Sequence, residues 1–383
     1  MMDNIYNSYL EIDLDEICNN VNKIRTGIGE GVDIIAVLKG DAYGMGLVTI
    51  GRHLAENCGV AAFACAQTWE AVQLRLRAGI TGDILVMGGV PFHNIPHVVE
   101  HQLHSPAYNH QYLTLLNDEA ALQGTTAAVH IKVETGLNRV GVWPGKQLDD
   151  LCLHLKSLES IVVAGAFTHF VESEIADKTS TYEQLRLFKD GLEQICNHGF
   201  TPKYVHAANT AASTWLQDPV LTHVRPAGLL FGFDVNIEPK NRFGLNEVLS
   251  WRAFVTNVKT IEKGETVGYN RAFMAQGTTQ IATFSAGYGD GYTRSLAMSG
   301  KAHAIVNGQR APIIGICMDQ TFLDVTGIDV AVNDVVTLIG QDGGECISIF
   351  ELQDKMQQTY LATIAVITQR VVLKYKQEVI YEQ

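Results

Sequence analysis

The chain has 383 residues, and its 28 Lys and Arg against 41 Asp and Glu give a formal net charge of −13. A content of 46% hydrophobic and 18% charged residues allows a buried core and excludes global disorder. The acidic balance argues against a nucleic-acid-binding protein, which normally carries a basic surface. The length accommodates two or three domains, or one barrel of about 250 residues with a remainder.

The N-terminal residues and the cysteines bear on the compartment. Residues 1–11 lack the basic and apolar regions of a secretory signal, and no apolar run approaches the ~20 residues of a membrane span. Seven cysteines are scattered without a C-x-x-C pair, at positions 18, 58, 65, 152, 196, 317 and 346. We therefore expect reduced thiols in a cytoplasmic protein, with neither a zinc site nor a disulfide framework.

Up to about residue 240, short apolar runs alternate with amphipathic stretches. The expected strands are Asp33–Leu38, Val60–Cys65, Asp83–Met87, Leu103–Tyr108, Ala127–Val133, Ile161–His169, Tyr204–Ala207 and Thr222–Arg225. Helical patterns occupy Ala66–Ala78, Leu113–Ala121, Gly145–Leu158 and Thr181–His198. Apolar strands separated by helices indicate a parallel sheet, and eight units in roughly 230 residues match a (β/α)₈ TIM barrel. A doubly wound sheet is the alternative, but no G-x-G-x-x-G follows the first strand.

Beyond Pro239 the pattern changes to short segments rich in Val, Ile, Thr and Phe. They are Leu249–Lys263, Thr278–Ser285, Ala302–Val306, Ala311–Ile316 and Asp334–Leu338, separated by glycine-containing turns. This pattern predicts a predominantly β C-terminal domain with one helix near Ser348–Lys355. We place the barrel at residues 12–240 and the β domain at 241–383, and expect residues 1–11 to pack with the β domain.

In a TIM barrel, functional side chains lie at the carboxyl ends of the strands. Lys39 follows the first expected strand, where a low dielectric favours a neutral amine that can form a Schiff base. A lysine that stands alone at a strand end is more often an ordinary surface residue. Lys132 and Arg139 flank the loop after the fifth strand, which suits an anionic ligand or a structural ion pair. His169 ends the sixth strand, either as a base or as a hydrogen-bonding residue.

The loops after the last two strands are candidates for a phosphate site. Asn209 and Thr210 fall at an expected helix N-terminus, which suits a phosphate or an ordinary N-cap equally well. Arg225 and Gly228 follow the eighth strand, where the backbone can approach a ligand closely. TIM barrels often bind phosphate at these two loops, so the coincidence at one rim favours a ligand site.

Several segments resemble the alanine racemases, pyridoxal-phosphate enzymes with a barrel and a β domain. The most specific is Ala36–Gly46, with the sequence AVLKGDAYGMG. Further similar segments follow in the order of the family, namely Leu10–Asp15, Lys132–Gly141, Val224–Gly232, Val267–Tyr269, Gly287–Tyr292 and Gly315–Gln320. The resemblance implies a cytoplasmic homodimer that interconverts L- and D-alanine, a reaction that can supply a peptidoglycan precursor.

By this resemblance, Lys39 binds the cofactor covalently and Tyr269 is the second acid–base residue on the opposite face. Racemisation needs a proton acceptor on one face of the substrate and a donor on the other. Both groups ordinarily titrate near pKa 10, so their surroundings have to favour a reactive form. Arg225 corresponds to the arginine that donates to the pyridine nitrogen. Because arginine keeps its proton, that nitrogen stays unprotonated, which favours reprotonation over transamination.

The remaining assignments also come from the resemblance. His169 links Arg225 to Tyr269, and Arg139 lies near the substrate carboxylate. Lys132 corresponds to a lysine that is often carbamylated and positions that arginine, or it is an ordinary lysine paired with Glu134. The set around the cofactor phosphate is Tyr43, Asn209, Thr210, Ala227, Gly228 and Tyr360. The set near the substrate is Met318, Asp319 and the entrance residue Tyr288. Met318 and Asp319, like Tyr269, contribute to the partner's active site, so the site is complete only in a head-to-tail dimer.

The chain departs from the family pattern at three positions. Met45 replaces a histidine, Thr210 replaces a serine, and Leu361 stands where relatives have glutamate after the tyrosine. Tyr360 is therefore either the phosphate-side tyrosine or a helix-surface residue, and the size of the substrate stays open. The alternatives are a racemase of serine or of a larger or basic amino acid, a basic amino-acid decarboxylase, a non-catalytic cofactor carrier, and a phosphosugar enzyme. Tyr269 and the Gly315–Gln320 segment favour a racemase.

Overall fold

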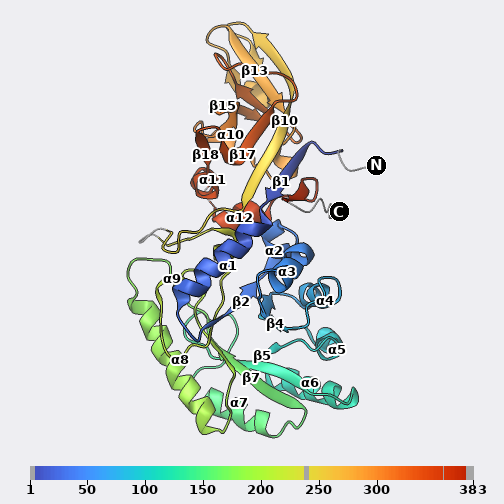
Figure 1. The fold of residues 1–383 in the computed structure, drawn as a ribbon, viewed down its shortest axis with the longest axis vertical. Coiled ribbons are helices and arrows are strands. Elements are labelled where there is room, and N and C mark those ends of the chain that lie inside the picture. Colours follow the sequence, from blue (N-terminus) through green and yellow to red (C-terminus); the bar gives the residue numbers. More distant parts are fainter. Residues whose placement is uncertain (1–4, 237–240, 357, 377–383) are drawn as a thin grey trace. The chain divides into compact units, whose positions relative to one another are not determined.

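The computed structural model describes residues 5–236, 241–356 and 358–376. The chain divides into two compact units. The barrel unit comprises Asp15–Ala42 and Leu47–Asn246, and the β unit comprises the chain up to Leu14, Tyr43–Gly46, and the chain from Glu247 onward. Figure 1 shows most of the barrel unit in blue and green and most of the β unit in yellow, orange and red. Among the described residues, no helix is long and apolar enough to span a bilayer.

The barrel unit contains eight parallel strands, in the order β4-β3-β2-β9-β8-β7-β6-β5. They are β2 (Asp33–Val37), β3 (Ala62–Cys65), β4 (Asp83–Val86), β5 (Ser105–Ala107), β6 (Ala127–Lys132), β7 (Ile161–Phe167), β8 (Tyr204–His206) and β9 (His223–Val224). His104 closes the ring, because its backbone bonds those of Ile84 and Val86, both at 2.9 Å. The predicted TIM barrel is therefore confirmed.

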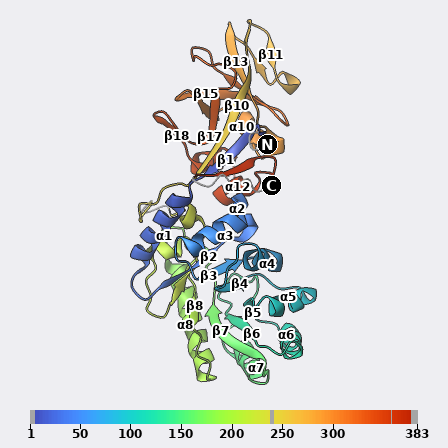
Figure 2. The same cartoon turned by 45° about the vertical axis from the view of Figure 1, so that its right-hand side comes forward.

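Helices connect these strands and cover the outside of the barrel (Figure 2). They are α1 (Leu14–Ile28), α3 (Leu47–Glu56), α4 (Thr68–Leu76), α5 (Ile95–Glu100), α6 (His110–Leu122), α7 (Lys146–Lys156), α8 (Thr179–Asn197) and α9 (Ala212–Trp215), with the 3₁₀ turns η1 (Phe92–Asn94) and η2 (Gly228–Phe231). Helix α8 buries Leu185, Phe188, Leu192 and Ile195, the three- and four-residue spacing of an amphipathic helix. That spacing is why the sequence predicts this helix well.

Each expected barrel strand is present, but the predictions run one or two residues too long at one or both ends. Leu38 illustrates the cause, because it is fully buried although β2 ends at Val37. Its N–H still donates to the carbonyl of Ala64 in β3 at 2.9 Å, so neither burial nor hydrogen bonding stops where the regular strand ends, and an apolar pattern does not mark that end.

The β unit is built on a nine-stranded sheet in the order β18-β17-β14-β15-β16-β13-β10-β1-β19. Its strands are β1 (Ser8–Ile12), β10 (Leu249–Ile261), β13 (Thr279–Phe284), β14 (His303–Val306), β15 (Gln309–Ile316), β16 (Thr321–Asp324), β17 (Val335–Asp342), β18 (Glu345–Ile347) and β19 (Val372–Tyr375). A separate ribbon pairs β11 (Thr266–Val267) with β12 (Phe273–Met274). Strand β1 lies between β10, to which it is antiparallel, and β19, to which it is parallel.

The predominantly β character of this unit agrees with the sequence. The expected helix is α11 (Ile349–Met356), but the structure adds α10 (Arg294–Met298) and α12 (Tyr360–Ala365), with the 3₁₀ turns η3 (Tyr269–Arg271) and η4 (Tyr288–Asp290). These extra helices have five and six residues, fewer than two turns, so they show no helical repeat in the sequence.

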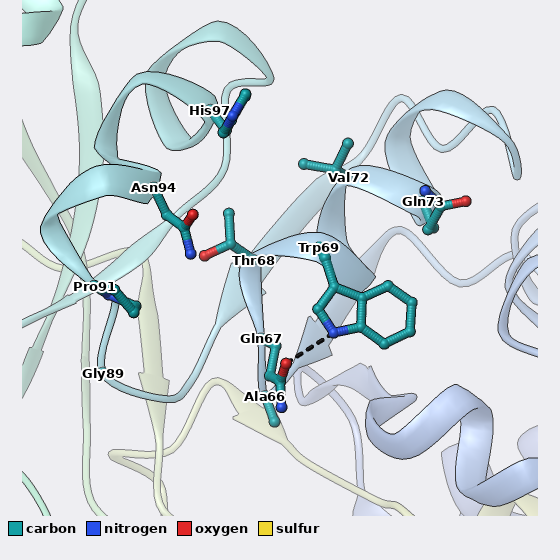
Figure 3. Close-up of a pocket in the computed structure, with 10 residues that line it drawn as sticks. All are labelled: Ala66, Gln67, Thr68, Trp69, Val72, Gln73, Gly89, Pro91, Asn94 and His97. Atoms are coloured by element: carbon teal, nitrogen blue, oxygen red, sulfur yellow. Dashed lines mark hydrogen bonds between the residues drawn. The ribbon is translucent and has the colours of Figure 1, made fainter.

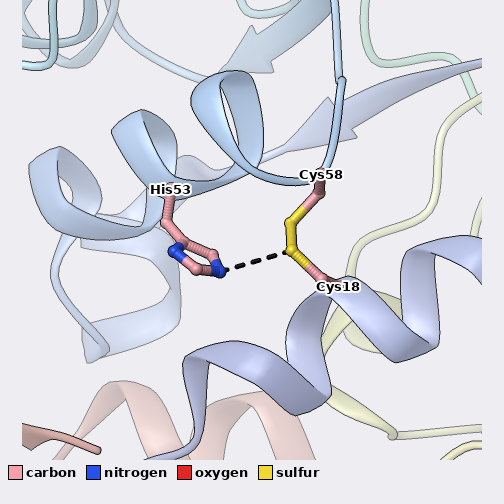
Figure 4. A group of neighbouring side chains, drawn as sticks. All are labelled: Cys18, His53 and Cys58. Carbon is pink, nitrogen blue, oxygen red and sulfur yellow. Dashed lines mark hydrogen bonds between the residues drawn. A yellow bond between two sulfur atoms is a disulfide. The ribbon is translucent and has the colours of Figure 1, made fainter. Parts of the chain in front are cut away.

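The expectation of reduced thiols is wrong for one pair. Cys18 on α1 and Cys58, two residues beyond α3, form a disulfide, and Nε2 of His53 lies 3.3 Å from the Cys18 sulfur (Figure 4). The other five cysteines are free, as expected. The bonded pair is 40 residues apart and carries no local motif, so only the folding of the barrel brings these sulfurs together.

The disulfide should stabilise the barrel unit measurably. It closes a 40-residue stretch that includes β2, Lys39 and α3, and the chain-entropy model gives about 4 kcal/mol for a loop of this length. We expect Cys18→Ser, or reduction of the native protein, to lower the free energy of unfolding by up to that amount in urea titrations. Cys196→Ser, at an exposed free thiol, is the control. Equal midpoints with and without reductant would contradict this expectation.

Candidate active site

The barrel unit gathers most of the predicted site residues at the carboxyl ends of its strands. Lys39 follows β2, Lys132 ends β6, and His169 lies two residues past β7. Arg139 is on the loop after β6, Asn209 and Thr210 are on the loop after β8, and Arg225, Ala227 and Gly228 follow β9. A barrel brings all of these loops to one rim, so residues almost 190 positions apart in sequence share one face.

Arg225 is the buried cation of this rim. Its Nη1 donates to the Nδ1 and the carbonyl of His206 at 2.7 and 2.8 Å, and its Nη2 donates to the carbonyls of Thr168 and Ala207 at 2.7 and 3.1 Å. Among the described residues, no carboxylate forms an ion pair with it. Burial lowers the pKa of Arg225 to about 9, so the guanidinium remains charged at neutral pH.

His169 lies against this guanidinium, with its Nδ1 3.3 Å from Nη2 of Arg225. Burial, followed by the positive charge of Arg225, holds the pKa of His169 far below its usual value. The ring is therefore neutral and accepts a hydrogen bond from the arginine, since a guanidinium can only donate.

Lys39 is half-buried at the first residue of α2 (Lys39–Gly44). Burial, and then the positive charge of Arg139, lower the pKa of its amine, while Glu70 acts in the opposite direction. A larger share of neutral amine at neutral pH suits a nucleophile or a base.

The backbone after Lys39 runs left-handed through the whole of α2. The φ angles of Gly40, Asp41, Ala42, Tyr43 and Gly44 are 64°, 56°, 51°, 60° and 82°. Three of these residues carry a Cβ, and each costs roughly 1–2 kcal/mol in this conformation. Strain of this kind persists only where the surroundings hold it, and it is concentrated at functional sites.

Glu70, which the sequence analysis did not single out, is one of the groups that hold this turn. Its buried carboxylate accepts from the backbone N–H of Gly40 at 2.5 Å and from those of Ala66 and Gln67, both at 3.0 Å. Glu70 is the third residue of α4 and closes a capping box with Gln67. A helix start with glutamate at this position is visible in sequence, so this residue could have been found.

Lys132 and Glu134, two residues apart in the chain, make separate hydrogen bonds with the backbone. Nζ of Lys132 donates to the carbonyl of Val133 at 2.9 Å, whereas the Glu134 carboxylate accepts from the backbone N–H groups of Thr135 and Gly136 at 2.8 and 2.7 Å. Burial is the main cause that lowers the pKa of Lys132 to about 8. A fraction of the Lys132 amine is therefore neutral near pH 7.

The two candidate phosphate loops are connected to each other. Asn209 Oδ1 accepts from the N–H of Ala212 at 3.1 Å, as an N-cap does, and from the hydroxyl of Ser173 at 2.7 Å. Thr210 Oγ1 accepts from the N–H of Ala227 at 3.0 Å, which joins the loop after β8 to the loop after β9. Gly228 then begins η2, and the first N–H groups of a helix lack partners inside it.

A pocket of about 550 Å³ lies between the β3–α4 and β4–α5 loops, with Trp69 and His97 on its walls (Figure 3). None of the predicted site residues lines it. The pocket lies next to the Glu70 carboxylate that holds the turn after Lys39, because Ala66 and Gln67 line the pocket and donate their N–H groups to Glu70. We therefore regard it as a neighbour of the Lys39 turn and not as the reaction centre.

Within the β unit, the structure brings together three of the predicted substrate-side residues. Tyr288 donates its N–H to the carbonyl of Cys317 at 3.1 Å, and the next residue donates to the carbonyl of Met318 at 2.8 Å. A Cβ at Gly287 would lie 2.3 Å from the Cys317 carbonyl, so this approach requires glycine. Arg370, which sequence reasoning missed, donates to Asp319 at 2.6 Å.

The tyrosines of this unit differ in exposure. Tyr269 on η3 is 73% exposed. Tyr360 begins α12 and is buried, with its ring centroid 5.5 Å from that of Phe350. The helix-surface alternative for Tyr360 is therefore wrong. Tyr43, in the left-handed turn, is buried as well.

Comparisons with known proteins agree with this geometry. The family model for the alanine racemase N-terminal domain matches residues 12–235, and that for the alanine racemase C-terminal domain matches residues 248–375. The chain belongs to the alanine racemase family. It is 35% identical over 366 residues to an alanine racemase of Methanococcus maripaludis, covering 95% of this chain and 97% of the relative.

Solved structures of the family share the whole architecture. The alanine racemase of Clostridium difficile 630 superposes with a TM-score of 0.92 at 28% identity, covering 99% of this chain and 98% of that one. A histidine racemase from Leuconostoc mesenteroides superposes with a TM-score of 0.86 at 26% identity, covering 97% and 98%. The same fold thus carries racemases named for side chains of very different size.

Glu70→Gln should loosen the turn that follows Lys39. One carboxylate oxygen becomes an NH₂ group that faces backbone donors, so at least one buried N–H loses its acceptor, at a cost of about 1–3 kcal/mol. We expect a lower free energy of unfolding and faster amide hydrogen exchange at residues 40–44. Glu193→Gln, at an exposed glutamate of α8, is the matched control. Unchanged exchange in residues 40–44 would refute the role given to Glu70.

Proposed function

We propose that this member of the alanine racemase family interconverts L- and D-alanine with pyridoxal 5'-phosphate as cofactor. The observation that carries the proposal is the cationic rim of the barrel, where burial, and then the charges of Arg139 and Arg225, lower the pKa of Lys39. Such a rim suits an anionic ligand and an amine nucleophile, and it outweighs the net charge of −13 locally. The names of the relatives at 35% identity support alanine as the substrate.

The residues present fit the cofactor. Lys39 would bind its aldehyde carbon, and Arg225, a buried cation without a carboxylate partner among the described residues, would face its ring nitrogen. The N–H groups at the start of η2, together with Asn209 and Thr210, would hold the phosphate. Tyr43 and Tyr360 are the further residues we assign to the phosphate. When bound, this group supplies an electron sink that acidifies the substrate Cα–H.

The protein side chains then move the proton. The Lys39 amine, with its lowered pKa, accepts or returns it on one face of the substrate, and the Tyr269 hydroxyl does so on the other. Arg139 binds the substrate carboxylate as a charge-assisted pair. Neutral His169 accepts from Arg225, so that the guanidinium is oriented without competition from a second cation. Met318, Asp319 and Tyr288 border the substrate.

We also propose that two chains form a homodimer with shared active sites, in which Tyr269, Met318 and Asp319 reach the partner's site. The exposure of Tyr269 (73%) and Met318 (51%) supports this, because large apolar side chains are commonly covered at interfaces.

We expect a cytoplasmic enzyme acting on small amino acids, with no nucleic-acid or membrane partner. In the cytoplasm the Cys18–Cys58 disulfide would respond to the redox state of the cell, since stable disulfides are rare in that compartment.

The deciding experiment measures racemisation directly. The purified protein, loaded with the cofactor, is incubated with single L-amino acids in deuterated water, and Cα exchange and optical rotation are followed. For alanine we expect deuterium exchange at Cα and loss of optical rotation. Lys39→Ala should show neither. In Tyr269→Phe, which lacks the second proton donor, kcat should fall at least tenfold. Release of carbon dioxide would favour a decarboxylase instead.

A racemase of another amino acid is the second candidate. The histidine racemase with the same architecture is the observation that keeps it open. One additional methylene is discriminated by only about 1–3 kcal/mol, so small changes at the entrance decide the substrate. Exchange of serine or histidine that exceeds that of alanine in the same panel would identify it.

Lys132 should react with carbon dioxide. Its neutral amine gains in population as pH rises through the pKa of about 8, and only the neutral form adds carbon dioxide. We expect a carbamate carbonyl signal in ¹³C NMR with labelled bicarbonate, stronger at pH 8.5 than at pH 7. Lys132→Met should abolish it, and Lys146→Met, at an exposed lysine of α7, should not. A signal that survives Lys132→Met would contradict the assignment.

A further inference from the structure

Three histidines cross the interior of the barrel in one hydrogen-bonded line that begins at Arg225. Its Nη1 is 2.7 Å from Nδ1 of His206, and Nε2 of His206 is 2.9 Å from Nδ1 of His130. Nε2 of His130 is 3.0 Å from Nδ1 of His104, and Nε2 of His104 is 3.4 Å from a carboxylate oxygen of Asp83. The line thus joins the guanidinium at the carboxyl rim to a carboxylate at the first residue of β4.

The two ends fix the direction of every bond in this line. A guanidinium has only donors, so Nδ1 of His206 must accept and the proton of that ring sits on Nε2. A neutral imidazole accepts through one nitrogen and donates through the other, so His130 and His104 are forced into the same form. The last donor meets Asp83, which accepts. Burial holds the pKa of His206 and His130 well below the usual value, which agrees with neutral rings.

We propose that Asp83 and His104 are positioning residues for Arg225, acting through His130 and His206. The carboxylate at the far rim sets the polarity of the line, and the line in turn holds Nη1 of Arg225 on His206. Its remaining N–H groups are thereby directed to the barrel carbonyls and to the ligand. The consequence for catalysis rests on the proposed function, because there Arg225 faces the cofactor ring. The arrangement of the protons does not rest on it.

The space around the line is built for these rings. A Cβ at Gly165, the β7 residue paired with His130, would lie 2.4 Å from Nδ1 of that imidazole, so only glycine leaves room. The ladder between β6 and β7 shifts its register between Val129 and His130. The ring of Tyr204 stacks on His130 with centroids 5.3 Å apart. Close packing of this kind prevents the rings from turning to another pattern.

The Asp83 end is fixed separately. The Tyr204 hydroxyl donates to one carboxylate oxygen, and Nζ of Lys203 lies 3.9 Å from the same oxygen. The hydrogen bond from His104 is the largest cause that holds the pKa of Asp83 well below its usual range. Asp83 therefore stays ionised and cannot donate back into the line. It is the anion to which buried Arg225 is connected.

The proton arrangement is tested by ¹⁵N NMR on the full-length protein labelled at histidine nitrogens. We expect His206, His130 and His104 to carry their proton on Nε2, with Nδ1 at the chemical shift of an acceptor. Single His→Gln variants assign the signals. A proton on Nδ1 of His206 or His130 would overturn the direction of the line, whether or not the protein is a racemase.

The functional part is tested on the cofactor-loaded enzyme with Asp83→Asn, which retains an acceptor oxygen but removes the charge. We expect kcat for alanine to fall about threefold to tenfold, with KM changed less. A change of this size lies within the range of coupling energies measured between residues of one hydrogen-bond network. The absorbance maximum of the bound cofactor should shift as well. Asp149→Asn is the matched control, because Asp149, on the outer helix α7, bonds at 2.8 Å with His198, the residue that follows α8.

His104 supplies the second test. His104→Leu breaks the line and should reproduce the effects of Asp83→Asn, whereas His104→Gln keeps a donor and an acceptor and should restore part of the activity. Variants that lose only thermal stability, with kcat and the cofactor spectrum unchanged, would show that the line is structural and overturn the proposal. A wild-type protein without cofactor absorbance would instead overturn the proposed function, so the two failures are distinguishable.

Discussion

A guanidinium buried at the mouth of a barrel is the constraint on which much of this structure depends. Arg225 is removed from water without an ion-pair partner among the described residues, and an unsatisfied buried charge would cost several kcal/mol. The barrel meets this demand with backbone carbonyls from β7 and β8 and with two imidazoles. His206 belongs to β8, and the other partners lie within two residues of the ends of β7 and β8, so the cation is positioned by groups attached directly to the barrel strands.

The neighbouring part of the rim, after β2, which pairs with β9, uses strain in place of charge. The chain leaves β2 and enters a left-handed turn of five residues, which presents the side chain of Lys39 and buries Tyr43. Glu70 accepts hydrogen bonds from this turn and from the start of its own helix, so a single carboxylate sets the relation between two neighbouring loops. The hydrogen bonds around Arg225 and the restrained turn after β2 preorganise the groups before a ligand arrives.

The sequence predicted what depends on local periodicity and on strand ends. It yielded the parallel barrel, the β domain, and the position of Lys39 and Arg225 at one rim, because inward-facing apolar runs and the residues after them are local features. It did not yield the Cys18–Cys58 bond, the ion pair of Arg370 with Asp319, or the line of histidines. These join residues from 26 to 76 positions apart, and only the closed fold defines their distances. The sequence left the burial of Tyr360 open, because a helix of six residues is too short to show which of its faces is apolar.

The position of β1 has a consequence for how the protein is made. This strand is synthesised before the barrel unit, yet its hydrogen-bond partners are β10 and β19, which begin about 240 and 360 residues later. The barrel unit lies between them in sequence and has all of its own strands available before β10 is synthesised. During synthesis the barrel should therefore fold first. Strand β1 stays unpaired until β10 and β19 have been synthesised and can pair with its two edges. A truncation that removes β19 would leave that first strand with an open edge, a known site of aggregation.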